Sequence, residues 1–291
     1  MRLLRYRNGS DAALGVLVND RVIPLCGLAA EYPTMLSIIA GGSRALEAIS
    51  VFQASGVDSV PLAEVHLMAP LERPGKFLAI GMNYRKHVEE AQRLGIPAPA
   101  NQFWFNKQTS CICGPYDAVD PGVSEALDYE AELCAVIGRP AKHVTAATAQ
   151  QHVFGYMVAN DFSARDWQKH SPTFTVAKSF DSYGPIGPWI VTADEVPDPH
   201  ALSIRCLVNG EVRQDSSTAD MVYDLWQQIA YLSSVMTLEP GDLIATGTPS
   251  GVGAGMSPPR FLHAADVIRC EIEGIGAIEN RVATPTIEQH R

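Results

Sequence analysis

Glu130 and Glu132, one residue apart, are the side chains in this sequence whose type and spacing best suit a metal site. They lie in a strand-like segment, where side chains alternate, so both carboxylates point to the same side, about 7 Å apart. Burial of two such charges is unfavourable unless a cation lies between them. A solvent-exposed strand face is the alternative explanation for the pair taken alone.

A third carboxylate, Asp161, directly follows an almost unbroken apolar segment at residues 153–160. Such a segment is typical of a buried strand, which would carry Asp161 into the interior. Three carboxylates without a Cys/His cluster favour a hard cation that prefers oxygen ligands. We therefore expect Mg²⁺ at these carboxylates, with Mn²⁺ or Ca²⁺ as alternatives.

Other polar residues suit the binding of an anion near these carboxylates. Arg165 can hold a carboxylate through two hydrogen bonds, and Gln168 can donate to a developing oxyanion. Lys107 and Lys178 lie in apolar segments, where a lysine needs an anionic partner unless its head group reaches the surface. Thr248 lies in a glycine-rich segment without P-loop or dinucleotide-binding spacing. Its hydroxyl and the nearby backbone N–H groups are candidate donors to a carboxylate.

His87 and Glu90 have the spacing of a catalytic pair. A helix is expected at residues 84–94, and residues three apart share one helix face. A carboxylate beside an imidazole orients it and raises its basicity, which suits the activation of water. An ordinary exposed pair is the alternative. Gly81 and Gly95 flank the helix and would allow it to move as a lid.

The composition limits the class of protein. The chain has 291 residues, of which 46% are hydrophobic and 19% charged, as in a globular protein. A net charge of -10 argues against nucleic acid or an acidic membrane surface as a partner. Six scattered cysteines, no signal-peptide pattern and no apolar stretch near ~20 residues predict a cytoplasmic location.

The expected elements divide the chain into a small N-terminal α/β domain at residues 1–70 and a catalytic domain at residues 71–291. The first domain has a β-hairpin at residues 15–25 and short helices at 34–41 and 43–52. The second has short strands, among them 77–81, 130–137, 155–160, 187–192, 203–209, 243–246 and 267–272, and one amphipathic helix at 219–236 with Thr218 as N-cap. This order does not alternate as βαβ units do, so it predicts a β-rich α+β fold and disfavours a Rossmann fold.

In this order, the segments from Lys76 to about Val282 resemble the fumarylacetoacetate hydrolase superfamily. The matching motifs are Ile80-Gly81-Met82-Asn83-Tyr84, Asp128-Tyr129-Glu130-Ala131-Glu132, residues 160–168, Lys178-Ser179-Phe180-Asp181, residues 184–188 and the glycine-rich residues 246–253. Residues 258–262 and 270–273 look like the branch with fumarylacetoacetate hydrolase domain-containing protein 2 and bacterial enzymes of aromatic catabolism.

The resemblance implies a mixed β-sandwich roll, a homodimer and a small anionic oxo-acid substrate. It implies Mg²⁺ held by Glu130, Glu132 and Asp161, with the metal chelating the 2-oxo and carboxylate oxygens. The remaining implied roles are Lys178 as charge stabiliser, Arg165 and Gln168 at the substrate or oxyanion, Tyr84, Arg85, Lys107 and Thr248 in substrate binding, and His87–Glu90 in the activation of water.

The implied activity is Mg²⁺-dependent hydrolysis of a C–C bond in a β-diketo acid, such as an acylpyruvate or a fumarylacetoacetate-like compound, through an enolate. Oxaloacetate decarboxylation or tautomerisation, or oxo-acid isomerisation or hydration, on the same site is the alternative. A non-catalytic protein that binds a metal or an oxo acid is a further alternative. The chain departs from the family pattern at Cys111-Ile112-Cys113 and Phe103-Trp104-Phe105, which leaves the size of the substrate open.

Overall fold

Two β-sheet layers form the main body in the computed structural model, which describes residues 1–284. The larger sheet contains β1 (Arg2–Asn8), β2 (Asp11–Val18), β3 (Arg21–Pro24), β4 (Val60–Pro61), β5 (His66–Met68), β6 (Phe77–Gly81), β7 (Phe103–Asn106), β8 (Ile112–Cys113), β10 (Ala131–Ile137), β11 (Val153–Asn160), β13 (Gly184–Thr192) and β16 (Leu243–Ala245). Its order is β4-β3-β2-β1-β13-β11-β10-β16-β6-β7, with β5 beside β1 and β8 beside β13.

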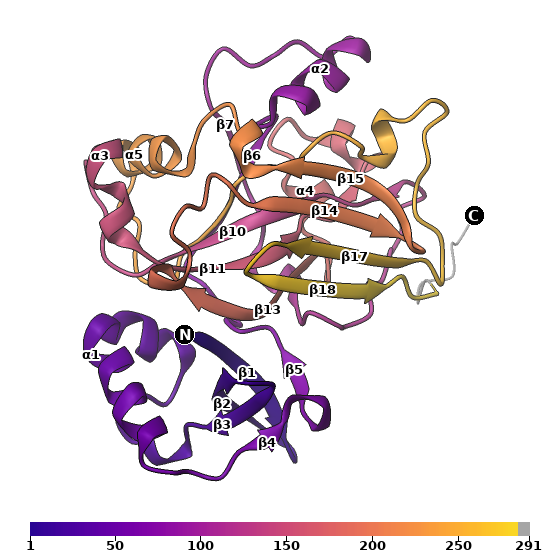
Figure 1. The fold of residues 1–291 in the computed structure, drawn as a ribbon. Coiled ribbons are helices and arrows are strands. Elements are labelled where there is room, and N and C mark those ends of the chain that lie inside the picture. Colours follow the sequence, from indigo (N-terminus) through magenta and orange to yellow (C-terminus); the bar gives the residue numbers. More distant parts are fainter. Residues whose placement is uncertain (285–291) are drawn as a thin grey trace.

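The smaller sheet has the order β15-β14-β17-β18, formed by β14 (Ser203–Val208), β15 (Glu211–Ser217), β17 (Val267–Ile272) and β18 (Gly276–Arg281). It lies across β10, β11 and β13 (Figure 1). Every residue of β10 and β11 is buried, as expected for strands covered on both faces. The β16–β6 and β13–β8 pairs are parallel and the other pairs antiparallel, so the predicted β-rich α+β fold is confirmed.

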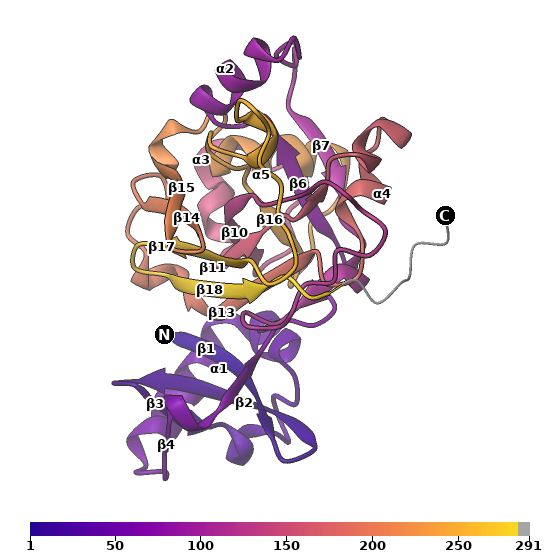
Figure 2. The ribbon, with the colours of Figure 1, turned by 90° about the vertical axis from the view of Figure 1, so that its right-hand side faces the viewer.

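The N-terminal unit contributes the far end of the larger sheet and packs below the main body (Figure 2). The predicted hairpin is present as β2 and β3, and Asn19 and Asp20 have the positive φ angles of a tight two-residue turn. β1 pairs with β13 through Arg2↔Val191 and Leu3↔Ile190. One sheet therefore runs through both expected domains, and their separation near residue 70 stays a prediction.

The helix α1 (Met35–Ala54) covers both expected short helices of the N-terminal unit. Gly42 interrupts it with φ 54° and ψ −134°, so it consists of two helical halves. Its length and apolar composition would suffice to cross a membrane, which the sequence interpretation did not foresee. Ile38, Ile39 and Ile49 on it are nevertheless buried in the main hydrophobic core.

The remaining helices are α2 (Arg85–Arg93), α3 (Ala146–Ala149), α4 (Thr175–Lys178) and α5 (Leu225–Val235), and β9 (Leu127–Asp128) pairs with β12 (Ser163–Ala164). The prediction of a helix from residue 219 with Thr218 as N-cap was wrong. Asp224 caps α5, and its side chain accepts from the Gln227 N–H. The backbone directly before α5 is bound by Asn83 and is not helical. Val222 N–H donates to the backbone oxygen of Asn83, and Tyr223 N–H donates to its side-chain oxygen.

Candidate active site

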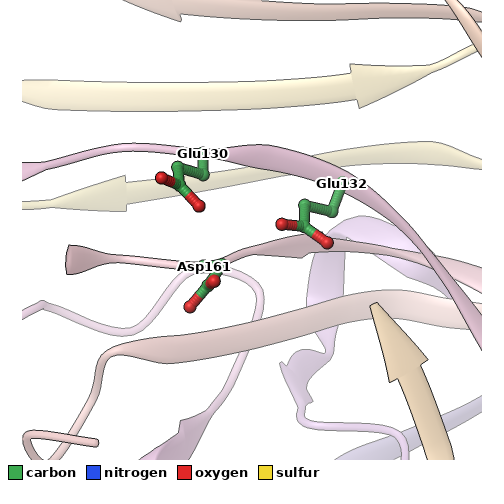
Figure 3. A group of neighbouring side chains, drawn as sticks. All are labelled: Glu130, Glu132 and Asp161. Carbon is green, nitrogen blue, oxygen red and sulfur yellow. The ribbon is translucent and has the colours of Figure 1, made fainter. Parts of the chain in front are cut away.

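The pairing of β10 with β11 brings the three predicted metal ligands together. Glu130 directly precedes β10, Glu132 is the second residue of β10, and Asp161 follows the end of β11. Because the strands are antiparallel, Asp161 N–H donates to the backbone oxygen of Glu130 at 2.9 Å. All three carboxylates are buried, and one oxygen of each lies within 4.8 Å of the others. Figure 3 shows them pointing toward one another.

Cations neutralise two of these carboxylates. Lys178 Nζ lies 2.7 Å from Glu130 Oε2 and 2.6 Å from Asp161 Oδ2. Arg165 donates to Glu130 Oε1 at 2.6 Å, and Lys107 to Asp161 Oδ1 at 2.6 Å. Burial acts to raise the pKa of Glu130, but the charges of Lys178 and Arg165 outweigh it and lower this pKa to about 2.

Glu132 is the carboxylate that lacks a cation. Within residues 1–284 it forms no ion pair with a lysine or arginine, and Gly247 N–H donates to its Oε2 at 2.8 Å. Burial and the negative charges of Asp161 and Glu130 raise the pKa of Glu132 well above that of an ordinary glutamate. The buried all-oxygen donor set, in which Glu132 lacks a cationic partner, fits a hard divalent cation.

Lys107 lies behind Asp161 and does not line the cavity. It follows β7, is buried, and donates to Asp161 and to the backbone oxygen of Lys178. Burial acts to lower the pKa of Lys107, but the charge of Asp161 outweighs it and raises this pKa. Lys107 thus supports a candidate metal ligand and α4, and its contact with substrate stays a prediction.

Arg165 is held by Asp128, a residue that was not predicted as part of the site. The Asp128 Oδ2 atom accepts from Arg165 Nε at 2.8 Å. Arg165 also donates to Gln168 Oε1 at 3.3 Å, which brings the two predicted oxyanion groups together in the cavity wall. Burial alone would lower the pKa of Arg165, but Asp128 and Glu130 raise it and keep the guanidinium charged.

His87 and Glu90 form the predicted pair. His87 Nδ1 lies 2.8 Å from Glu90 Oε2, and both residues line the cavity. The other oxygen of Glu90 accepts from Gly251 N–H at 2.9 Å, which docks α2 against the glycine-rich segment. Met82 and Gly95, on either side of α2, have positive φ angles. Movement of α2 as a lid stays a prediction.

Two residues beside the pair do not reach the cavity. Tyr84 is the N-cap of α2 and fully buried, and its hydroxyl has no hydrogen-bond partner in the described structure. Burial and the charges of Glu132 and Asp220 raise its pKa. The Arg85 side chain is 59% exposed and donates to the backbone oxygen of Ala219. Neither side chain lines the cavity, and the contacts of both with substrate stay predictions.

Thr248 lines the cavity, as expected, but its hydroxyl has protein partners. It donates to the backbone oxygen of Ala131 at 2.9 Å and accepts from Gln214 Nε2 at 2.8 Å. The glycine-rich segment thus anchors β10, Glu132 and Glu90. Its composition was the one sequence signal for these contacts. Asp128 begins one of the family motifs but was given no role, and nothing in the sequence pointed to Gln214.

A cavity of about 500 Å³, a typical size for an organic ligand site, is lined by one of the three carboxylates, Glu130. One part of its wall is polar and contains His87, Glu90, Glu130, Arg165, Gln168, Lys178 and Thr248. The other is apolar and includes Ile80, Met82, Leu94, Ile96, Pro97, Pro99, Phe103, Phe105, Phe174 and Val252. The arrangement can hold an anionic ligand beside a cation and bring water to it.

Comparison with known proteins gives a consistent assignment. The family description "Fumarylacetoacetate (FAA) hydrolase C-terminal" matches residues 76–283. The chain is 43% identical over 290 residues to the mitochondrial oxaloacetate tautomerase FAHD2A of Homo sapiens, covering 97% of this chain and 91% of the relative. The Dictyostelium discoideum homologue of fumarylacetoacetate hydrolase domain-containing protein 2 is 41% identical over 284 residues, covering 92% of each chain.

Solved structures of bacterial enzymes are also similar to the chain. A fumarylacetoacetate hydrolase from Exiguobacterium antarcticum has a TM-score of 0.84 and 36% identity, covering 98% of this chain and 99% of that one. A maleylpyruvate hydrolase from Sphingobium sp. SYK-6, in complex with manganese(II) and pyruvate, has a TM-score of 0.83 and 33% identity, covering 98% and 100%. The chain therefore belongs to the fumarylacetoacetate hydrolase family of enzymes.

Proposed function

We propose that this enzyme is a Mg²⁺-dependent hydrolase that cleaves a C–C bond in acylpyruvates, with Mn²⁺ as an alternative metal. The observation that carries the proposal is the His87–Glu90 pair, 2.8 Å apart, in the same cavity wall as Glu130. Tautomerisation moves a proton and can also use His87, whereas decarboxylation of a chelated oxo acid does not need a water-activating pair. Hydrolysis needs one, because water is a poor nucleophile near pH 7.

The acid–base step follows from the position of the imidazole. Glu90 keeps the proton on His87 Nδ1, so Nε2 is the nitrogen that accepts a proton from water. The water oxygen bonds to the distal carbonyl carbon, C4 of the acylpyruvate. The C3–C4 bond then breaks, its electron pair passes to the pyruvate enolate, and His87 returns the proton to C3. The products are a carboxylic acid and pyruvate.

The other polar residues bind and stabilise charge. A divalent cation at the three carboxylates would polarise the 2-oxo acid and stabilise the enolate. Arg165 NH1 donates to Gln168 Oε1, which leaves the Gln168 Nε2 group as a donor to the oxyanion formed at C4. Lys178 brings a positive charge to the cavity beside Glu130 and Asp161.

The test of the proposal uses the wild type and His87→Ala with acylpyruvates and oxaloacetate in Mg²⁺ and H₂¹⁸O. The wild type should release pyruvate and a carboxylic acid with one ¹⁸O atom. His87→Ala should lose about 10²–10⁴-fold in kcat, the usual contribution of a positioned general base. His263→Ala, outside the cavity wall, is the matched control. A wild type that consumes no acylpyruvate would overturn the proposal.

Tautomerisation or decarboxylation of oxaloacetate is the second candidate function. It is favoured by relatives named as oxaloacetate tautomerases, at 40–43% identity over up to 97% of this chain. Neither reaction adds water to the substrate, so neither product gains ¹⁸O through C–C hydrolysis. Rapid oxaloacetate turnover together with inert acylpyruvates would therefore select this candidate.

A further inference from the structure

The apolar part of the cavity wall contains a cluster of three aromatic rings close to the charged groups. Phe103 and Phe105 each meet Phe174 edge to face, with ring centroids 5.3 Å and 5.9 Å apart. Lys178 Nζ lies 5.0 Å from the centroid of Phe105. The cluster therefore begins beside the cation that pairs with Glu130, and a ligand extending from the charged groups would contact the rings.

The backbone at Phe174 is unusual. This residue precedes α4 and has φ 58°, a left-handed conformation that is rare and unfavourable for a residue other than glycine. Its ring lines the cavity, while Lys178 lies at the other end of α4. Phe174 and α4 together thus bring an apolar ring and the charge of Lys178 to the same cavity.

Apolar side chains from the segment after α2 complete this part of the wall. Leu94 is 54% exposed and Ile96 51% exposed, and both line the cavity with Pro97 and Pro99. Apolar surface that is exposed next to a cavity gains free energy when an apolar ligand covers it. The same segment follows the helix of His87 and Glu90, so contact with a ligand would also hold the catalytic pair in place.

Most cationic groups of the cavity wall are already paired with protein carboxylates and are not free to bind a second carboxylate on the substrate. Within the described residues, the wall contains Arg165, Lys169 and Lys178 besides His87. Arg165 pairs with Asp128 and Glu130, and Lys178 pairs with Glu130 and Asp161. Lys169 is exposed to solvent, where its charge is hydrated. Lys169 is therefore the one cation to test as a partner for a distal carboxylate.

We infer that the substrate carries an apolar acyl group, a straight alkyl chain of several carbons or a phenyl group, in place of a second carboxylate. This inference rests on the proposed hydrolysis of acylpyruvates and names the class within it. Phe103, Phe174 and Ile96 are the residues that determine specificity, because they line the apolar wall without pairing with any charged group described above.

The first experiment measures kcat/KM for acetyl-, butanoyl-, hexanoyl- and benzoylpyruvate and for fumarylpyruvate. The value should rise about fourfold for each added methylene until the wall is covered, as expected from the transfer free energy of a CH₂ group. Fumarylpyruvate should be the poorer substrate, because its second carboxylate would lose water of hydration against the apolar wall. A flat series or a preference for fumarylpyruvate would overturn the inference, and loss of that preference in Lys169→Gln would identify Lys169 as the partner of the second carboxylate.

Variants test which residues cause the dependence of kcat/KM on the length of the acyl chain. Phe174→Ala and Ile96→Ser should flatten the chain-length series, because each removes apolar surface from the cavity wall. Val176→Ala is the matched control, because Val176 lies on α4, is 45% exposed and is absent from the cavity wall. Ile96→Ser changes an exposed side chain, so it keeps the test valid if Phe174→Ala fails to fold. An unchanged series in Ile96→Ser and in folded Phe174→Ala would contradict the assignment.

The second experiment separates this inference from the proposed function by measuring binding. Calorimetric titration in Mg²⁺ compares 2-oxohexanoate with 2-oxoadipate, which has the same chain length and a second carboxylate. Tighter binding of 2-oxohexanoate, weakened by Ile96→Ser, supports the apolar pocket even if no acylpyruvate is hydrolysed. Equal or tighter binding of 2-oxoadipate overturns the pocket assignment even if hydrolysis is observed.

Discussion

Asp128 and Arg165 join the glycine-rich segment to the charged centre of the site. Asp128 Oδ2 accepts from Arg165 Nε at 2.8 Å and from Ala254 N–H at 3.0 Å, while Oδ1 accepts from Gly253 N–H at 2.7 Å. Arg165 in turn donates to Glu130. A buried carboxylate that was not among the predicted site residues thus fixes both the loop and the guanidinium.

Asp128→Asn should therefore destabilise the fold. The variant leaves the largely buried Arg165 without its full anionic partner and replaces one acceptor oxygen by an NH₂ group. Loss of one partner of a buried ion pair costs about 3–5 kcal/mol in the free energy of unfolding. Urea denaturation followed by circular dichroism measures the change. Asp198→Asn, at an exposed aspartate, should stay within about 0.5 kcal/mol of wild type. Equal stability of the two variants would contradict the role of Asp128.

Glu132→Gln should affect the thermal stability of the metal-free protein and that of the metal-loaded protein differently. Removing a buried charge that has no cationic partner should leave the melting temperature of the metal-free protein unchanged or higher. The stabilisation by Mg²⁺, about 2.7 kcal/mol in wild type at 100 times Kd, should disappear with the lost ligand.

Differential scanning calorimetry with and without Mg²⁺, after treatment with a chelator, measures both effects. Glu89→Gln changes an exposed glutamate on α2 and should behave as wild type. If Mg²⁺ raises the melting temperature of Glu132→Gln as much as that of wild type, the cation does not bind at Glu132. Full activity of chelated wild type would argue against any metal requirement.

The resemblance to the family also predicts a homodimer. Multi-angle light scattering at micromolar concentration should give about twice the chain mass of 31.4 kDa. Exposed apolar side chains such as Val51, Val235 and Tyr116 are available to such an interface. A mass of one chain across the concentration range would refute this assembly.

The sequence predicted those parts of the site that depend on local periodicity. Alternation along a strand indicated that Glu130 and Glu132 share one side, and helical spacing indicated that His87 and Glu90 share a face. The same helical geometry explains the placement of Arg85, because residues two apart on a helix do not face each other.

Contacts between distant segments could not be predicted in this way. An apolar environment indicated that Lys107 needs an anion, but not that the anion is Asp161, 54 residues away. The start of α5 was missed because Thr218 has the chemistry of an N-cap, whereas Asn83 engages the N–H groups that follow it. The roles of Asp128 and Gly251 likewise depend on how the glycine-rich segment packs against α2 and β9.

Gly255→Ala tests the contact that holds the catalytic pair. A methyl group on this glycine would overlap the Glu90 carboxyl group, which lies directly against it. Glu90 would have to move away from Gly251 N–H and His87 Nδ1, so the imidazole would lose its orientation. Acylpyruvate hydrolysis should fall by up to the 10²–10⁴-fold that a positioned general base contributes, with Mg²⁺ affinity retained.

The matched control is Gly210→Ala, in the turn between β14 and β15 outside the cavity wall. It has φ 80° and nothing within 4 Å of the added methyl group, so it should lower stability through backbone strain and leave turnover unchanged. Steady-state kinetics, calorimetric Mg²⁺ titration and thermal denaturation are measured on both variants. Hydrolysis by Gly255→Ala at the wild-type rate would show that Glu90 need not stay docked on the glycine-rich segment, and the mechanism proposed for His87 would then fail.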